Sequence, residues 1–144
     1  MKRMLNYIPF ILFTLAFVSF IIPVVHEKEE GITISYNTYD LLIGSGMQDM
    51  SIGLLIAFIL LIISIIFSVT TIKNPTNFRL SVAVISGLVS GTLFFFSRIL
   101  ASPTITDLKL SAGLIIPGVL IIAATILIFI NVKINANKKD SVSD

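Results

Sequence analysis

The stretch SIGLLIAFILLIISIIFSVTTI, residues 51–72, runs for 22 positions without one charged side chain. Crossing the roughly 30 Å hydrocarbon core of a bilayer takes about 20 apolar residues, because an α-helix rises about 1.5 Å per residue. The stretch is therefore long enough for a transmembrane helix. Three further stretches share its length and apolar character: residues 5–25, 80–100 and 111–130.

These four stretches predict an all-α membrane protein whose fold is a four-helix transmembrane bundle. We expect one domain over residues 1–134 and a polar, frayed tail over residues 135–144. The basic start Met1-Lys2-Arg3 is also typical of a secretory signal peptide. However, the apolar run that follows exceeds the usual length of about 7–15 residues, and no A-x-A-like cleavage site precedes His26. We therefore expect the first span to be retained.

The composition favours a lipid environment. Hydrophobic residues make up 56% of the 144 positions, 12% are charged, and the mean hydropathy is +1.02. Soluble domains average roughly 45–50% apolar and about 25% charged residues, and a chain this short cannot hide so much apolar surface in water. The chain has no cysteine, which excludes disulfides and thiolate metal sites. Isoleucine occupies 26 positions, which favours a bacterial source with AT-rich DNA.

Lysine and arginine predict the orientation, because cytoplasmic loops carry an excess of both. Seven lie beside one set of span ends and three beside the other. The seven mark the cytoplasmic side of the plasma membrane, so we expect both termini in the cytoplasm and the loop of residues 26–50 outside the cell. These scattered residues form no patch that predicts nucleic-acid binding. The seven are Lys2, Arg3, Lys73, Arg79, Lys133, Lys138 and Lys139, and the three are Lys28, Arg98 and Lys109.

The predicted outer loop contains strand signals. Residues 32–36, Ile-Thr-Ile-Ser-Tyr, alternate apolar and hydroxyl-bearing side chains, which is typical of a strand with one buried face. Residues 39–43, Tyr-Asp-Leu-Leu-Ile, follow after two positions. We expect these two segments to form a small β-hairpin over the helix ends. Alternatively, residues 39–43 form a short interfacial helix, with Tyr36 and Tyr39 at the level of the lipid headgroups.

The spans offer no residues for catalysis. None has a central Asp, Glu, Lys or His, so the embedded carboxylate of a proton-coupled exporter is missing, and no G-x-S-x-G or Ser-His-Asp arrangement occurs. His26 lies beside Glu27, Glu29 and Glu30, but one imidazole without a second imidazole or a thiolate specifies zinc poorly. We therefore predict no enzymatic activity, no cofactor and no metal site.

Arg98 is the one charged residue inside a predicted span, two residues from its outer end. We expect its side chain to snorkel to the interface or to pair with Asp107, Asp40 or Asp49. Otherwise it contacts a headgroup or a partner. The candidate interaction residues of the outer rim are Tyr36, Tyr39, Asp40, Arg98 and Asp107.

Small residues recur at every fourth position of the third span, at Ala83, Gly87 and Gly91. Such a stripe lets helix backbones approach closely, which drives association where lipid supplies no hydrophobic force. We expect the stripe to pack either within the chain or against a second chain. In the fourth span, Pro117 beside Gly118 is placed to kink the helix.

Together these features predict a non-catalytic integral membrane protein that acts by helix association and through its outer loop, as an accessory subunit or an envelope-stress or immunity factor. The expected partners are membrane lipid and either a second copy or another membrane protein. The alternative is a small oligomeric channel or transporter. The layout resembles that of the claudin-like tetraspan proteins, but this chain lacks the Trp and paired Cys of their loop, so the likeness extends to topology alone.

Overall fold

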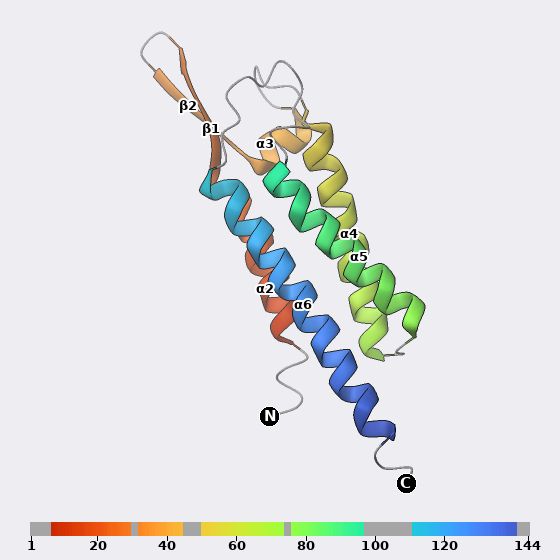
Figure 1. Cartoon of the computed structure of the whole chain (residues 1–144). Helices are drawn as coiled ribbons and strands as arrows, with labels where there is room; N and C mark the ends of the chain where they lie inside the picture. The colour runs from red at the N-terminus through yellow and green to blue at the C-terminus, as the bar shows by residue number, and fades with distance from the viewer. Residues whose placement is uncertain (1–6, 30–31, 45–49, 74–75, 97–110, 141–144) are drawn as a thin grey trace.

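The protein is a bundle of helices that carries a small β-hairpin at one end (Figure 1). The computed structural model describes residues 7–29, 32–44, 50–73, 76–96 and 111–140. Helix α5 packs between α4 and α6, and α2 packs against α6. The elements, in chain order, are α2 (Ile8–Ser19), β1 (Pro23–Glu29), β2 (Ile32–Asn37), α3 (Thr38–Ile43), α4 (Ile52–Lys73), α5 (Asn77–Phe96) and α6 (Ala112–Asp140).

Three of the described helices are long and apolar enough to cross a membrane: α4, α5 and the first 23 residues of α6. Their surfaces agree with that role. Large apolar side chains such as Ile56 and Ile66 of α4 and Ile126 of α6 are exposed, whereas Ser64 and Ser90 are fully buried. A protein in water shows the reverse distribution, so the exposed surface indicates membrane association.

The first predicted span differs from its expected form. Helix α2 has 12 residues, which gives a length of only about 18 Å. After Ser19 the chain turns through i→i−3 hydrogen bonds, ending with Ile22 N–H to Ser19 O at 3.0 Å, and β1 begins at Pro23. Proline disfavours a helical conformation in the residue before it, and Val24 and Val25 then suit a strand. The apolar run of residues 5–25 is therefore split between a helix and a strand.

The hairpin is also formed by a different pair of segments from the one predicted. Strand β2 contains the expected residues 32–36, but its antiparallel partner is β1, with Val25 opposite Tyr36 and His26 opposite Ser35. Residues 39–43 belong to helix α3, as the alternative prediction had it.

A capping box accounts for the start of α3. The Oδ1 atom of Asn37 accepts hydrogen bonds from the N–H groups of Tyr39 and Asp40, at 2.9 and 3.1 Å, and Asp40 Oδ2 accepts from Asn37 N–H at 2.9 Å. These bonds satisfy amides that a helix start leaves free. Gly44 ends α3 in the left-handed conformation, with φ of 74°, where glycine has no Cβ to clash.

Helix α6 is longer than the predicted span. It runs for 29 residues to Asp140 and contains Pro117. The segment from residue 135 onward, expected to be frayed, is thus helical as far as residue 140, and residues 141–144 lie outside the described part.

The stripe of Ala83, Gly87 and Gly91 lies at the contacts of α5 with its two neighbours. A Cβ atom on Gly87 would overlap Thr125 Oγ1 of α6 and lie 2.7 Å from Ser64 Oγ of α4. A Cβ on Gly91 would lie 2.5 Å from Ile122 Cγ1 of α6. All three stripe residues are buried, so this face of α5 is occupied within the chain.

Replacing Gly87 by valine tests this packing. We expect Gly87→Val to lower the free energy of unfolding by about 1–3 kcal/mol, because added methyl groups in a tight contact force backbone shifts. Leu88→Val, at an exposed position of the same helix, is the control and should change little. Denaturation of the purified protein by SDS in mixed micelles, followed by circular dichroism, measures both; equal stability of the two variants would contradict the assignment.

Candidate functional site

The hairpin is joined to the helices by a set of backbone and side-chain contacts that we call the hairpin junction. It comprises the end of α2, the base of β1 and β2, and α3, packed on the first turns of α4 and α6. Thr38 N–H donates to Phe20 O at 3.0 Å, and Ser51 N–H donates to Leu41 O at 2.9 Å. The hydroxyl of Tyr39 donates to Phe17 O at 2.9 Å. The first of these bonds pairs the Phe20 carbonyl just after α2, and the Tyr39 hydroxyl adds a bond to the Phe17 carbonyl, which also accepts from Phe20 N–H at 3.2 Å.

Gly113 lets the first turn of α6 approach the start of β1. A Cβ atom on Gly113 would lie 2.6 Å from Ile22 O and 2.8 Å from Pro23 O. The hydroxyl of Thr38 also faces this turn, with its Oγ1 atom 3.5 Å from Gly113 O. The base of the hairpin is thus held between α6 and α3.

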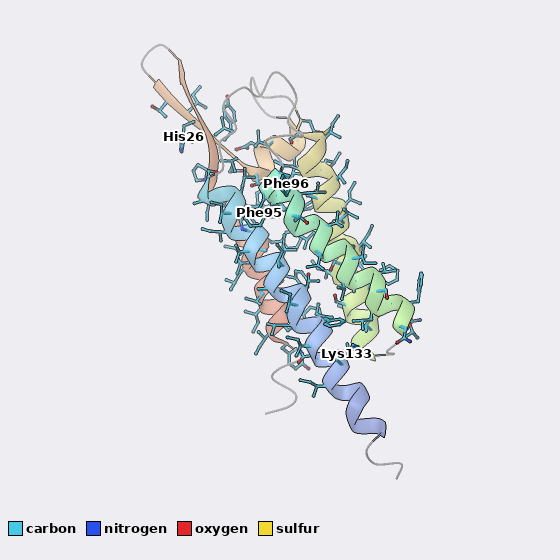
Figure 2. The ribbon with its side chains drawn as sticks, viewed as in Figure 1. His26, Phe95, Phe96 and Lys133 are labelled. Carbon is cyan, nitrogen blue, oxygen red and sulfur yellow. The ribbon has the colours of Figure 1, made fainter. Side chains whose placement is uncertain are left out.

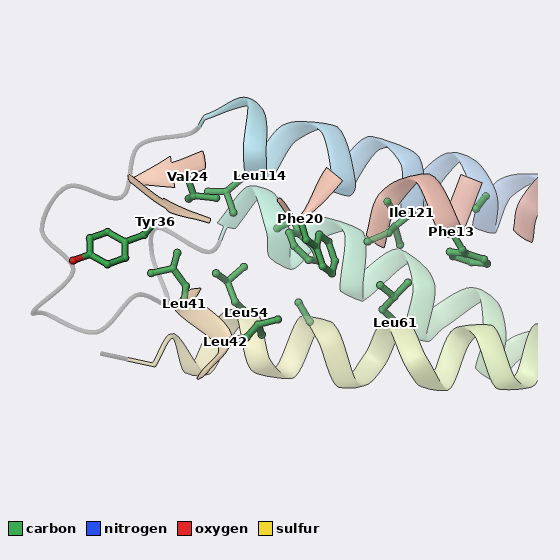
Figure 3. Packing of buried hydrophobic residues seen from close by; sticks show 14 of the residues in the cluster. Phe13, Phe20, Val24, Tyr36, Leu41, Leu42, Leu54, Leu61, Leu114 and Ile121 are labelled. Carbon is green, nitrogen blue, oxygen red and sulfur yellow. The ribbon is translucent and has the colours of Figure 1, made fainter. Parts of the chain in front are cut away.

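Phe20 is the centre of the junction and is completely buried (Figure 3). Its ring stacks on Phe94 of α5, with 5.2 Å between centroids, and meets Tyr39 edge-on at 5.6 Å. It also lies 5.5 Å from the ring of Phe17 and 6.3 Å from that of Phe58 on α4. Aromatic rings from four elements therefore fill the space at this end of the bundle.

The three described residues of the predicted outer rim all contribute to this support. Tyr36 is buried, Tyr39 is half-buried and bonded to α2, and Asp40 caps α3. Arg98 and Asp107 lie outside the described residues, as does Asp49, and the predicted pairing of Arg98 stays a prediction.

Among the described side chains beyond the base of the hairpin, the exposed ones were not singled out as a group by the sequence: His26, Thr33, Ile34 and Ser35. Figure 2 shows His26 on the hairpin, away from the helices. The alternation of residues 32–36 was the available signal for an exposed face. Which face is exposed depends on Val25 and Tyr36 being buried at the junction.

One exposed pair has the atoms of a nucleophile and a base. His26 Nδ1 and Ser35 Oγ lie 2.8 Å apart across the two strands. A catalytic pair also needs a group that orients the imidazole and donors that stabilise an oxyanion, and within the described residues the His26 side chain makes no hydrogen bond beyond this one. A cross-strand hydrogen bond that stabilises the hairpin accounts for this pair.

No protein-family model matches this chain, and no curated protein or solved structure matches it at a significant level.

The contribution of Phe20 to stability can be measured by comparing its substitution with that of its neighbour Ile21. We expect Phe20→Ala to cost about 3–5 kcal/mol of stability, because it leaves a cavity among four rings. Ile21→Ala, at a position 63% exposed, should cost far less. Hydrogen exchange of the amides of β1 and α3 measures the local effect; unchanged protection in Phe20→Ala would show that the ring does not hold the hairpin.

Proposed function

We propose that the chain is a non-catalytic integral membrane protein that presents its hairpin outside the cell to a partner, as an accessory subunit or an envelope-stress or immunity factor. The observation that carries the proposal is the hairpin junction, which holds the base of the hairpin firmly while leaving His26, Thr33 and Ser35 exposed. A hairpin alone in water is marginally stable, so contacts that preserve it favour a role in recognition.

The proposed orientation is supported by charge and by the arrangement of the helices. Helix α2 begins and α6 ends at the end of the bundle opposite the hairpin (Figure 1). The segments that flank this opposite end carry seven of the ten Lys and Arg residues, which is typical of the cytoplasmic side. In this arrangement α2 would be the fourth, short span, extended toward the outer surface by β1.

Helix α3 suits a position at the membrane surface on the hairpin side. Leu41 and Leu42 are buried against the bundle, while Ile43 is 78% exposed at the end of the helix. Met50 and Ile52, at the start of α4, are also exposed. Apolar side chains gathered below the hairpin are expected where the bilayer surface meets the protein.

The sequence predicted association through the helices and through the outer loop. Association through the hairpin now has the stronger support. The small-residue stripe is occupied by α4 and α6, so it supports association of helices within the chain. A partner would therefore meet the exposed hairpin.

Within the hairpin, we propose that the partner adds an extended segment to the free edge of β2. Among the described residues, β2 pairs with β1 alone. Residues 32–37 include no charged side chain, whereas β1 contains His26, Glu27, Lys28 and Glu29. Charged residues discourage pairing at a strand edge, and strand addition is a common mode of peptide recognition.

The alternative, a small oligomeric channel or transporter, draws less support from the contacts. It would need Ser and Thr residues along a polar path. Ser64, Ser90 and Thr125 instead donate to the backbone carbonyls of Ala83, Ala57 and Ile121, at 2.7–2.8 Å. Solute or ion flux through liposomes that contain the purified protein would favour this alternative over the proposed function.

Because the chain has no cysteine, single cysteines report its topology directly. We expect Thr33→Cys to react with a membrane-impermeant maleimide in intact cells, and Ser143→Cys to react only after permeabilisation. The opposite labelling pattern would show that the orientation is the reverse of the proposed one. Labelling of both cysteine variants in intact cells would contradict a cytoplasmic C-terminus.

Added charge at the β2 edge tests the recognition mode. We expect the tagged protein, solubilised in mild detergent, to retain a stoichiometric partner. Thr33→Lys should reduce the recovered partner at least about tenfold, because it places a charge on the pairing edge. Glu27→Lys, on the already charged strand β1, is the control and should retain it. Equal recovery with both variants would contradict strand addition, and the absence of any partner or oligomer would contradict the proposed function.

A further inference from the structure

Positive charge is concentrated in the segments of sequence that adjoin the end of the bundle opposite the hairpin. The segments that flank this end contain seven Lys and Arg residues and two acids, Asp140 and Asp144, which gives a net charge of +5. The remaining three basic and six acidic residues, in sequence segments 26–50 and 97–110, give −3, and the sum agrees with the formal net charge of +2. The two sets of sequence segments therefore carry net charges of opposite sign.

The length of α6 places its lysines at a definite depth. Figure 1 shows α6 extending past α2, α4 and α5 at the basic end. Its 29 residues span about 43 Å, against roughly 30 Å of hydrocarbon. Lys133 follows Ala112 by 21 residues, or about 32 Å along the axis. If α6 enters the hydrocarbon near Ala112, Lys133 lies at its far boundary and Lys138 and Lys139 lie among the headgroups.

The side chains around Lys133 agree with this depth. Phe129, Ile130 and Ile134 are exposed, so α6 presents apolar surface up to this level. The Nζ atom of Lys133 lies 5.6 Å from the centroid of the Phe129 ring, and the side chain is exposed (Figure 2). An ammonium above an apolar stem and an aromatic ring can reach a phosphate while its stem stays in the hydrocarbon.

We propose that the end of α6 defined by Lys133, Lys138 and Lys139 binds the headgroups of anionic phospholipids. Charge complementarity selects this occupant: a zwitterionic headgroup offers a phosphate but no net charge, whereas the sequence segments that adjoin this end sum to +5. Each lysine near an anionic surface should strengthen binding about fivefold. The proposal does not involve the hairpin and holds whatever partner the hairpin recognises.

The absence of tryptophan from the chain allows a direct test. Phe129→Trp places a single fluorophore beside Lys133, and Phe96→Trp places one at an exposed position at the hairpin end of α5. Each full-length variant is reconstituted in phosphatidylcholine vesicles with brominated phosphatidylglycerol or brominated phosphatidylcholine, and quenching is compared. We expect Phe129→Trp to prefer the brominated anionic lipid by about fivefold or more, with the preference falling at high salt. Phe96→Trp should show no preference.

Glutamine substitutions assign the preference to the lysines. In the Phe129→Trp background, combined Lys133→Gln, Lys138→Gln and Lys139→Gln should remove it, while Lys28→Gln should leave it intact. Equal quenching by the two lipids at Phe129→Trp, or a preference that survives the triple substitution, would overturn the proposal. The comparison of the two tryptophan positions stands even if the triple variant does not fold. Quenching of neither tryptophan would overturn membrane insertion as well.

Discussion

The close approach of α5 to α4 and α6 is the contact on which the rest of the structure depends. Gly87 leaves space for the side chains of Ser64 and Thr125, and Gly91 leaves space for Ile122. At this short distance the hydroxyl of Ser64 reaches a carbonyl of α5. In apolar surroundings an unpaired hydroxyl costs several kcal/mol. The glycines allow the helices to approach closely, and this approach brings the hydroxyl of Ser64 to its acceptor. Either feature without the other would be unfavourable.

The end of helix α2 packs through large aromatic rings rather than through small residues, and this packing supports the hairpin junction. Between α2, α4 and α5 the space is filled by large rings, with Phe20 at their centre. The chain turns directly after these rings, and β1 emerges beside the first turn of α6 at Gly113. A broad aromatic layer at one end of the bundle thus supports a hairpin that its own two strands would hold only marginally.

The two ends of the molecule suit different contacts. The hairpin end carries a supported strand pair with an uncharged edge, and the opposite end carries a basic helix that extends past its neighbours. Tyr36, Tyr39 and Asp40 were among the candidate interaction residues predicted for the outer rim. The structure uses all three to support the hairpin, because a short loop of this kind needs its amphipathic side chains for packing. The exposed part of the hairpin includes His26, Thr33, Ile34 and Ser35, and the alternation of residues 32–36 was the sequence signal that pointed to it.

The sequence by itself determined the three long apolar helices, the small-residue stripe and the strand at residues 32–36, since each depends on local hydropathy or spacing. Only the tertiary structure decided how residues 5–25 divide between a helix and a strand, which segment pairs with β2, and which helices cover Gly87 and Gly91. A run of apolar residues is compatible with a buried strand as well as with a helix. The choice depends on the cross-strand partner of Val25, the capping box at Asn37 and the close contact at Gly113, and these join residues that are distant in the chain or act only in the folded state.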